Sequence, residues 1–350
     1  MIKKIIPLLM TFSVYAGQPR TAGDVTGTLP WLTGPLLTPS GHVVPVGHYN
    51  IEPYFYATNI VGSYDRHWQA HSLPSAWKNN LQIPVQIGIT DTIDFAFTPQ
   101  GFYNYTRDAH TFNLGDLSLE IDYQLYKNET TTWTPALKLS LEETFPTGRY
   151  QRLNPAKRGT DAIGLGAYTT TVGLTFSALK HVIRKHYLSL RASASYSMAP
   201  PVHVTRLNSY GGDKTTKGKV RPGNSLATLV GLEFSLNHNW VLAFDAMNAY
   251  TNKTHFSGKT TAPVGSASSN QISFAPAIEY NFNQKAGLIA GVWFSAFGRN
   301  SSDFVSYVIA YNYYGSSKKH GLEPFHPHGG RGGSGGAGGG GHGGGHGGAK

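Results

Sequence analysis

The feature that most constrains this chain is a period of two in hydrophobicity. Three runs between Gly115 and Phe176 alternate apolar with polar or small side chains: GDLSLEIDYQLY, TPALKLSLEETF and GAYTTTVGLTF. Successive residues of a β-strand point to opposite faces, so this pattern gives a strand one apolar face. In an α-helix, residues three and four apart share a face, and the same pattern would spread the apolar side chains around the helix. The pattern predicts an all-β protein.

Similar runs recur along most of the sequence and predict twelve strands. Their approximate ranges are 48–58, 81–89, 93–97, 115–126, 134–145, 166–176, 187–196, 226–234, 240–246, 272–282, 288–294 and 304–314. Long links are expected after strands one, three, five, seven and nine, and mostly short turns after the even strands. A soluble β-sandwich would explain strands of this kind but not the alternation of short and long connections.

The alternation of links favours a membrane barrel. Lipid offers no partners to backbone N–H and C=O groups, so membrane strands must close into a ring. Bacterial barrels have an even number of strands, short periplasmic turns and longer outer loops. We therefore expect a transmembrane antiparallel up-and-down β-barrel of about twelve strands, located in the outer membrane.

The face opposite the apolar one becomes the lumen. Charges on the lipid side cost a few kcal/mol each near mid-bilayer, so the charged residues of the strands are expected to face inward. The candidates are Asp94, Glu120, Asp122, Lys138, Glu142, Arg191, Glu233, Asp245 and Glu279. Acids outnumber bases, which favours either a mild cation preference in an open pore or a set of internal ion pairs.

The two ends of the chain differ in composition from the predicted barrel. Residues 1–16 have two lysines, an apolar run and a small-residue cleavage site, as in a secretory signal peptide. Residues 17–47 form a Pro/Gly-rich segment without periodicity, interpreted as a periplasmic lead-in or as a plug that enters the lumen. Residues 48–314 are the predicted barrel, and 315–350 a disordered Gly/His-rich tail.

Three of the quoted stretches resemble a known family. GDLSLEIDYQLY, PALKLSLEETFPTGRY and GTDAIGLGAYTTTVGLTF are similar to the outer-membrane barrel family labelled MetA-pathway of phenol degradation, or transporter-like outer-membrane protein. The shared features are a Gly-Asp-Leu strand opening, a strand that ends in Phe-Pro-Thr-Gly, and a Gly-x-Gly strand start. The resemblance implies a barrel that takes up small, including aromatic, compounds. The chain departs from such barrels at its end, because thirty-six residues follow Tyr314.

Two groups of side chains are candidate binding sites outside the lumen. Arg149, Arg152, Lys157 and Arg158 lie in one long loop, where they would pair with lipopolysaccharide phosphates or remain solvated. His326, His328, His342 and His346 stand in the Gly-rich tail, where imidazoles would give weak divalent-metal binding without fixed geometry. No cofactor is expected, and the absence of cysteine removes disulfide and thiolate-metal sites.

Composition and motifs narrow the function. The chain is 40% hydrophobic and 14% charged, with a net charge of +10, but an exported chain makes nucleic acid a poor partner. A lipid hydrolase at the outer rim would use His110, His203 or His255 with Ser209 or Ser257, although no spacing pairs a nucleophile with a base.

We predict a non-enzymatic passive channel for a small, aromatic or hydrophobic solute. Its other expected partners are outer-membrane lipid, lipopolysaccharide and the barrel-assembly machinery. The alternatives are a structural or surface-interaction barrel with a filled lumen and, third, the lipid hydrolase.

Overall fold

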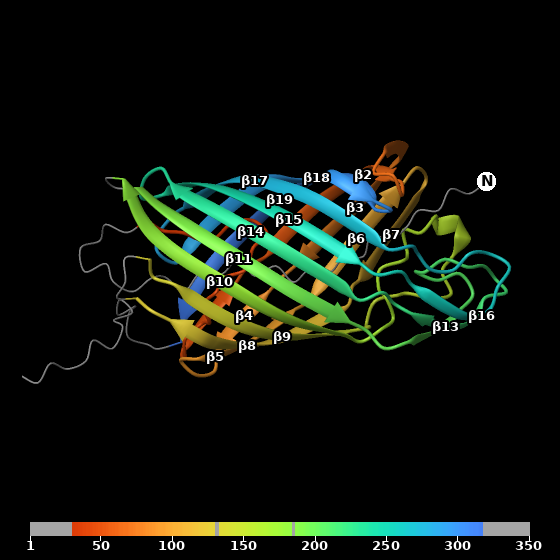
Figure 1. Ribbon diagram of the computed structural model, residues 1–350, viewed down its shortest axis with the longest axis horizontal. Helices are drawn as coiled ribbons and strands as arrows, with labels where there is room; N and C mark the ends of the chain where they lie inside the picture. Colours follow the sequence, from red (N-terminus) through yellow and green to blue (C-terminus); the bar gives the residue numbers. More distant parts are fainter. Residues whose placement is uncertain (1–29, 130–132, 184–185, 318–350) are drawn as a thin grey trace, which may run out of the picture.

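The computed structural model describes residues 30–129, 133–183 and 186–317. One antiparallel sheet closes on itself as a twelve-stranded barrel, seen from the side in Figure 1. The last strand, β19 (Ser302–Ser316), closes it by pairing with β18 (Ala286–Arg299) on one side and with β1 (His48–Ile51) and β2 (Tyr54–Tyr64) on the other. The predicted fold class and strand number are confirmed.

Four strands are interrupted, so each carries two labels. The pairs are β1 with β2, β3 (Ala70–Gln82) with β4 (Val85–Gly88), β5 (Ile93–Thr98) with β6 (Gln100–Thr106), and β7 (Ala109–Leu114) with β8 (Leu117–Lys127). The remaining strands are β9 (Ala136–Phe145), β10 (Thr169–Ile183), β11 (His186–Met198), β14 (Ser225–Ser235), β15 (Trp240–Thr251), β17 (Ser269–Asn281), β18 and β19. Pro53, Pro84 and Pro99 stand at three of the interruptions, where a residue without N–H breaks the ladder.

Two of the predicted long links are wrong. The predicted loop that ends at Asn80 is a strand pair, β2 and β3, joined by residues 65–69, and the predicted loop that ends at Leu114 is the hairpin of β6 and β7. Side chains near the turn between β2 and β3 are exposed on both faces of β3. A strand end that leaves the membrane needs no apolar face, so its sequence lacks the alternation used to find it.

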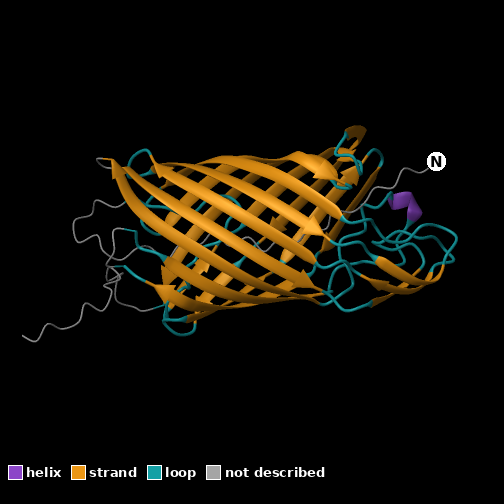
Figure 2. Cartoon of the chain, in the orientation of Figure 1, coloured by secondary structure: helices purple, strands orange, loops and turns teal. Residues whose placement is uncertain are grey.

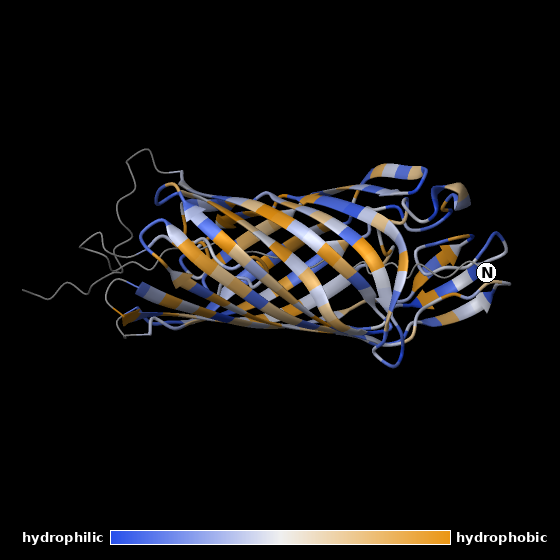
Figure 3. Cartoon of the chain, turned by 90° about the horizontal axis from the view of Figure 1, so that it is seen from above, coloured by the Kyte–Doolittle hydropathy of each residue, from blue (hydrophilic) through white to orange (hydrophobic). Residues whose placement is uncertain are grey.

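The barrel wall keeps the predicted alternation. In β14 every second side chain is buried, and the residues between them, such as Leu226, Val230 and Leu232, are exposed. Figure 3 shows apolar residues alternating with polar ones along the strands of the wall. The described residues contain no helix long and apolar enough to span a bilayer. The exposed apolar face of the sheet is therefore the surface that lipid would cover.

Three long loops gather at one end of the barrel, hereafter the long-loop end. They are residues 146–168, 199–224 and 252–268. They contain the short helix η1 (Pro155–Lys157) and a small sheet of β12 (Val202–Thr205), β13 (Lys217–Arg221) and β16 (His255–Lys259), which extends beyond the barrel in Figure 2. Val202, Val204 and Val220 form the apolar side of this sheet.

Residues 30–47, hereafter the lumen segment, lie inside the barrel. The N–H of Trp31 donates to the carbonyl of His238 in a short turn, and the carbonyl of Gly47 accepts from Ser317. Between these points Leu36 and Leu37 are 0% and 2% exposed. Their burial contributes roughly 1.5–3 kcal/mol per side chain. The segment thus enters the lumen as the plug interpretation predicts, whereas residues 17–29 fall outside the described part.

Candidate functional site: the lumen and its cavity

The lumen segment has no regular secondary structure, so its N–H groups need acceptors inside the barrel. Carboxylates of the wall provide them. The N–H of Thr33 donates to Glu279 (2.5 Å), and the N–H of Val44 donates to Asp94 (2.5 Å). These bonds fix the two ends of the segment to opposite parts of the wall, β17 and β5.

Asp245 of β15 holds the middle of the segment. Its carboxylate accepts from the N–H groups of Leu37 (3.1 Å) and Thr38 (3.0 Å) and from the Thr38 hydroxyl (2.6 Å). Hydrogen bonds to a charged acceptor contribute about 1.5–3 kcal/mol each. Asp245 is therefore the strongest single anchor of the lumen segment.

Other charged side chains of the interior form pairs. Lys138 Nζ lies 2.6 Å from Asp122, and Arg191 lies 3.5 Å from Glu233; all four side chains are at most 1% exposed. Arg191 also donates to the carbonyl of Thr38 (3.3 Å). The sequence left two alternatives for the charged lumen residues, a cation preference and internal ion pairs. These contacts are ion pairs of the second kind.

All nine sequence-predicted lumen residues are buried inside the barrel. Asp94, Asp245 and Glu279 contact the lumen segment directly, and Arg191 contacts it through its guanidinium. The others are the paired residues above together with Glu120 and Glu142, which are 6% and 7% exposed. None of the nine lines the cavity described next.

Wall glycines are the part of this arrangement that sequence reasoning missed. A Cβ at Gly88 would lie 2.0 Å from the carbonyl oxygen of Pro45, and one at Gly231 would lie 2.6 Å from Pro35. The lumen segment therefore approaches the wall where no side chain stands. A glycine at an inward-facing position of an alternating strand indicates that another backbone comes close there. Such glycines are the sequence signal for where the segment contacts the wall.

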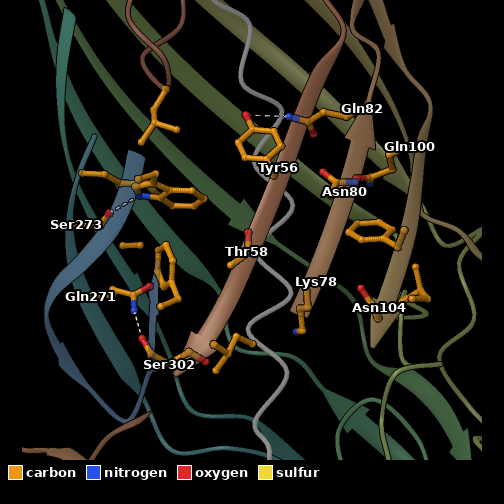
Figure 4. A pocket seen from close by; sticks show the side chains of 18 of the residues that line it. Tyr56, Thr58, Lys78, Asn80, Gln82, Gln100, Asn104, Gln271, Ser273 and Ser302 are labelled. Atoms are coloured by element: carbon orange, nitrogen blue, oxygen red, sulfur yellow. Dashed lines mark hydrogen bonds between the residues drawn. The ribbon is translucent and has the colours of Figure 1, made fainter. Parts of the chain in front are cut away.

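Beside the lumen segment lies a cavity of about 130 Å³ (Figure 4). Leu37 from the lumen segment, and Ala162 and Ile163 from the loop 146–168, contribute to its lining. One wall is mainly polar and comes from β2, β3 and β6; its residues are Tyr56, Thr58, Ile60, Lys78, Asn80, Gln82, Gln100, Phe102 and Asn104. The facing wall is more apolar and comes from β14 to β19; its residues are Leu229, Met247, Ala249, Gln271, Ser273, Trp293, Ser302 and Phe304.

The register of the strands orders the polar wall in rows. Thr58, Lys78 and Asn104 stand directly opposite one another across β2, β3 and β6, and Tyr56, Asn80 and Phe102 form the next row. Figure 4 shows Tyr56, Thr58, Lys78, Asn80 and Asn104 facing the same space. Since paired residues of neighbouring strands share a face, the rows present amide, hydroxyl and ammonium groups together.

An aromatic group with members from both walls lines part of the cavity. The rings of Tyr56 and Trp293 are 6.4 Å apart, and those of Trp293 and Phe304 are 4.9 Å apart, both edge to face. The indole N–H of Trp293 donates to Ser273 (2.9 Å). Ring contacts together with a hydrogen bond hold Trp293 in a fixed orientation.

Asp116 holds the loop 146–168 against the cavity. Its carboxylate accepts from the N–H of Gly148 (2.7 Å) and from the N–H of Leu165 (3.2 Å). A Cβ at Gly164 would lie 2.7 Å from the same carboxylate. The Gly-Asp, Phe-Pro-Thr-Gly and Gly-x-Gly stretches that carry the family resemblance thus meet at one point, next to Ile163.

The basic residues of this loop are exposed except for the half-buried Lys157, and most have partners. Arg149 donates to the carbonyl of Arg152 (2.9 Å), Lys157 to the carbonyl of His110 (2.9 Å), and Arg158 to Asp108 (3.0 Å). These contacts tie the loop 146–168 to the hairpin of β6 and β7.

Ser209 is engaged elsewhere, and His203 and Ser257, also considered for catalysis, are held apart. Ser209 is 3% exposed and donates to the carbonyl of Gly164 (2.7 Å). His203 and Ser257 both stand opposite Lys219, on either side of β13. Two strand spacings separate them by about 10 Å. His326, His328, His342 and His346 lie outside the described residues, so their metal binding stays a prediction.

A closed twelve-stranded barrel with an apolar outer face and an occupied lumen is the fold of an outer-membrane β-barrel. No protein-family model matches the sequence, and no curated protein is significantly similar to it. Among solved structures, the chain is similar to the COG4313 outer membrane channel from Pseudomonas putida F1. The TM-score is 0.59 at 15% identity, covering 79% of this chain and 98% of that one.

More distant matches include the toluene transporter TodX of P. putida, with a TM-score of 0.35 at 12% identity over 79% of this chain and 92% of that one. The NanC porin matches with a TM-score of 0.36 at 10% identity over 75% and 98% of the two chains. Scores this low support no argument. The match to the P. putida channel shows the fold, in agreement with the resemblance noted from the sequence.

Proposed function

We propose that this protein is a passive outer-membrane channel for small solutes with an aromatic or hydrophobic part. The observation that carries the proposal is the cavity inside the closed barrel, lined in part by an aromatic group and by amides. Ligand sites are typically concave and largely apolar, with a few placed polar groups. The solved channel with the same fold is described as an outer membrane channel, which supports the same class.

The lumen segment sets the expected behaviour of the channel. A solute that enters from the long-loop end meets Leu37 at the cavity and must pass the lumen segment to reach the short turns. Conductance should therefore be small, and it should rise when the segment is released.

Proteoliposome swelling tests the proposal. Arabinose, leucine and phenylalanine cross bilayers slowly, so their entry reports the protein. An aromatic-lined path should pass phenylalanine at least as fast as the smaller arabinose. Swelling no faster than in protein-free liposomes for all three solutes would refute the channel.

A matched pair of variants locates the path. Ala249→Trp places an indole in the cavity lining and should slow swelling at least about fivefold, because a ring fills much of a cavity this small. Leu242→Trp, on the exposed face of the same strand, is the control and should leave swelling unchanged. Equal swelling for both variants would place the path elsewhere.

A structural barrel with a filled lumen is the second candidate. The buried carboxylate anchors of the lumen segment favour it, because they hold the segment across the interior. In that case no conductance and no swelling should be measured, even in lipid mixtures that keep the barrel folded.

We further infer lipopolysaccharide as a partner of the long-loop end. Arg149, Arg152, Lys157 and Arg158 are joined there by the exposed Lys217, Lys219 and Arg221 of β13. Phosphate groups pair well with such side chains. Replacing the four loop residues with glutamine should lower the gain in thermal stability that lipopolysaccharide gives; an unchanged gain would exclude them.

A further inference from the structure

The cavity carries a single charged side chain. Lys78 is the one charged residue of its lining. Within residues 30–129, 133–183 and 186–317, no ion pair or hydrogen bond to its Nζ is found. The acids of the lumen cluster around the lumen segment instead, where Asp94, Asp245 and Glu279 accept its N–H groups.

The amides around Lys78 already donate to the protein. Asn80 donates to the carbonyl of Gly101 (3.2 Å), Gln100 to the carbonyl of Asp116 (2.7 Å), and Asn104 to the carbonyl of Thr160 (3.2 Å). Each amide thus uses one N–H for its own anchoring. The ammonium of Lys78, with three donors, is the strongest group on this wall for an anion.

An aromatic surface begins one row away. Thr58 stands opposite Lys78, and Tyr56 of the next row leads to Trp293 and Phe304. A cavity of about 150 Å³ holds one benzene ring, so about 130 Å³ corresponds to a ligand with one ring. A charge and an aromatic surface within one small cavity match a ring that bears one anionic group.

We propose that the cavity is a binding site for small aromatic carboxylates, with the carboxylate on Lys78 Nζ and the ring against Tyr56 and Trp293. The proposal rests on the proposed channel function and specifies its solute class. Lys78 acts as the specificity-determining residue, because the ammonium of Lys78 attracts anions and repels cations of the same shape.

Isothermal titration of the detergent-solubilised full chain tests the site with three probes of one shape. Benzoate is anionic at pH 6.5, benzamide is neutral and benzamidinium is cationic. Wild type should bind benzoate about tenfold more tightly than benzamide, and benzamidinium more weakly still. Equal affinities for the three probes would overturn the proposal without any variant.

Substitutions at Lys78 assign the effect to one residue. Lys78→Met should remove the preference for benzoate while leaving benzamide binding within about twofold, and Lys78→Arg should restore the preference. Lys217→Met removes the same charge from the exposed face of β13 and serves as the control. A benzoate preference that survives in Lys78→Met would overturn the assignment.

The outcomes separate this inference from the channel function. If phenylalanine crosses the membrane but benzoate, benzamide and benzamidinium bind alike, the channel stands and the anionic class is wrong. If arabinose, leucine and phenylalanine all fail to cross and none of the three probes binds, both proposals are wrong.

Discussion

Single residues decide how the interior of this barrel is filled. Asp245 and Asp116 have the same role at two places in the barrel. Each carboxylate accepts hydrogen bonds from two N–H groups of a segment that lies outside the strands of the wall. Asp245 holds the lumen segment, and Asp116 holds the loop 146–168. Both carboxylates lie in strands predicted from the sequence, but only Asp245 is among the residues predicted to face the lumen.

Asp116→Ala tests the anchor of the loop. The change leaves the N–H groups of Gly148 and Leu165 without their acceptor, which should cost about 2–3 kcal/mol of local stability. Amide hydrogen exchange over residues 146–168 should become about 30- to 100-fold faster, since each 1.4 kcal/mol is tenfold in an equilibrium.

Asp108→Ala is the control for this prediction. Asp108 is exposed and pairs only with Arg158 among the ion pairs of the described residues. Exposed pairs contribute little, so exchange at Gly148 and Leu165 should stay unchanged. Protection of those two amides that survives in Asp116→Ala would show that the carboxylate is not the anchor.

At the scale of elements, the transmembrane strands could be predicted and their extensions could not. Lipid on one side forces alternation, so strands such as 226–234 are found from Leu226, Val230 and Leu232. The outer parts of β2 and β3 carry no such constraint. Twelve strands follow from the pattern, whereas the position of each outer turn does not.

The lumen segment is hidden from sequence for a different reason. Thr38 and its acceptor Asp245 are 207 residues apart, and nothing local in a Pro/Gly-rich stretch marks a partner on β15. The sequence therefore left the plug as one of two interpretations. The cavity was missed entirely, because its lining comes from many strands and its polar residues look like any inward-facing position.

The small sheet of the long loops carries an unusual charge arrangement. Lys217 of β13 stands directly opposite Lys259 of β16. Like charges directly opposite each other destabilise a strand pair. The stability of the sheet is thus lower than its apolar side alone would give.

Lys259→Glu should stabilise this sheet by about 0.5–1 kcal/mol, because it converts a repulsive pair into an attractive one. Hydrogen exchange of β13 should slow about two- to fivefold at low salt, and the gain should shrink at 1 M salt as screening increases. Lys253→Glu makes the same charge change outside the sheet and should have no such effect. A gain that persists at 1 M salt would rule out the electrostatic cause.

At the scale of the whole molecule, the fold combines a closed ring of strands with an irregular segment, residues 30–47, inside it. The wall closes through β19 on β1 and β2, and the lumen segment contributes no strand to this ladder. The segment adds buried leucines and carboxylate contacts inside that ring. The proposed channel function requires the barrel to keep this closure while the segment changes position.

The proposal that the lumen segment limits passage through the barrel is tested most directly by the conductance of one double-cysteine variant. The native chain has no cysteine, and the Thr38 hydroxyl lies 2.6 Å from Asp245. Thr38→Cys with Asp245→Cys should form a disulfide that fixes the segment and should remove its hydrogen-bond anchor. In planar bilayers we predict small unit conductance when the pair is oxidised and a clear, reversible increase on reduction. No conductance in either state, or equal conductance in both with the disulfide verified by mass, would contradict a channel limited by residues 30–47.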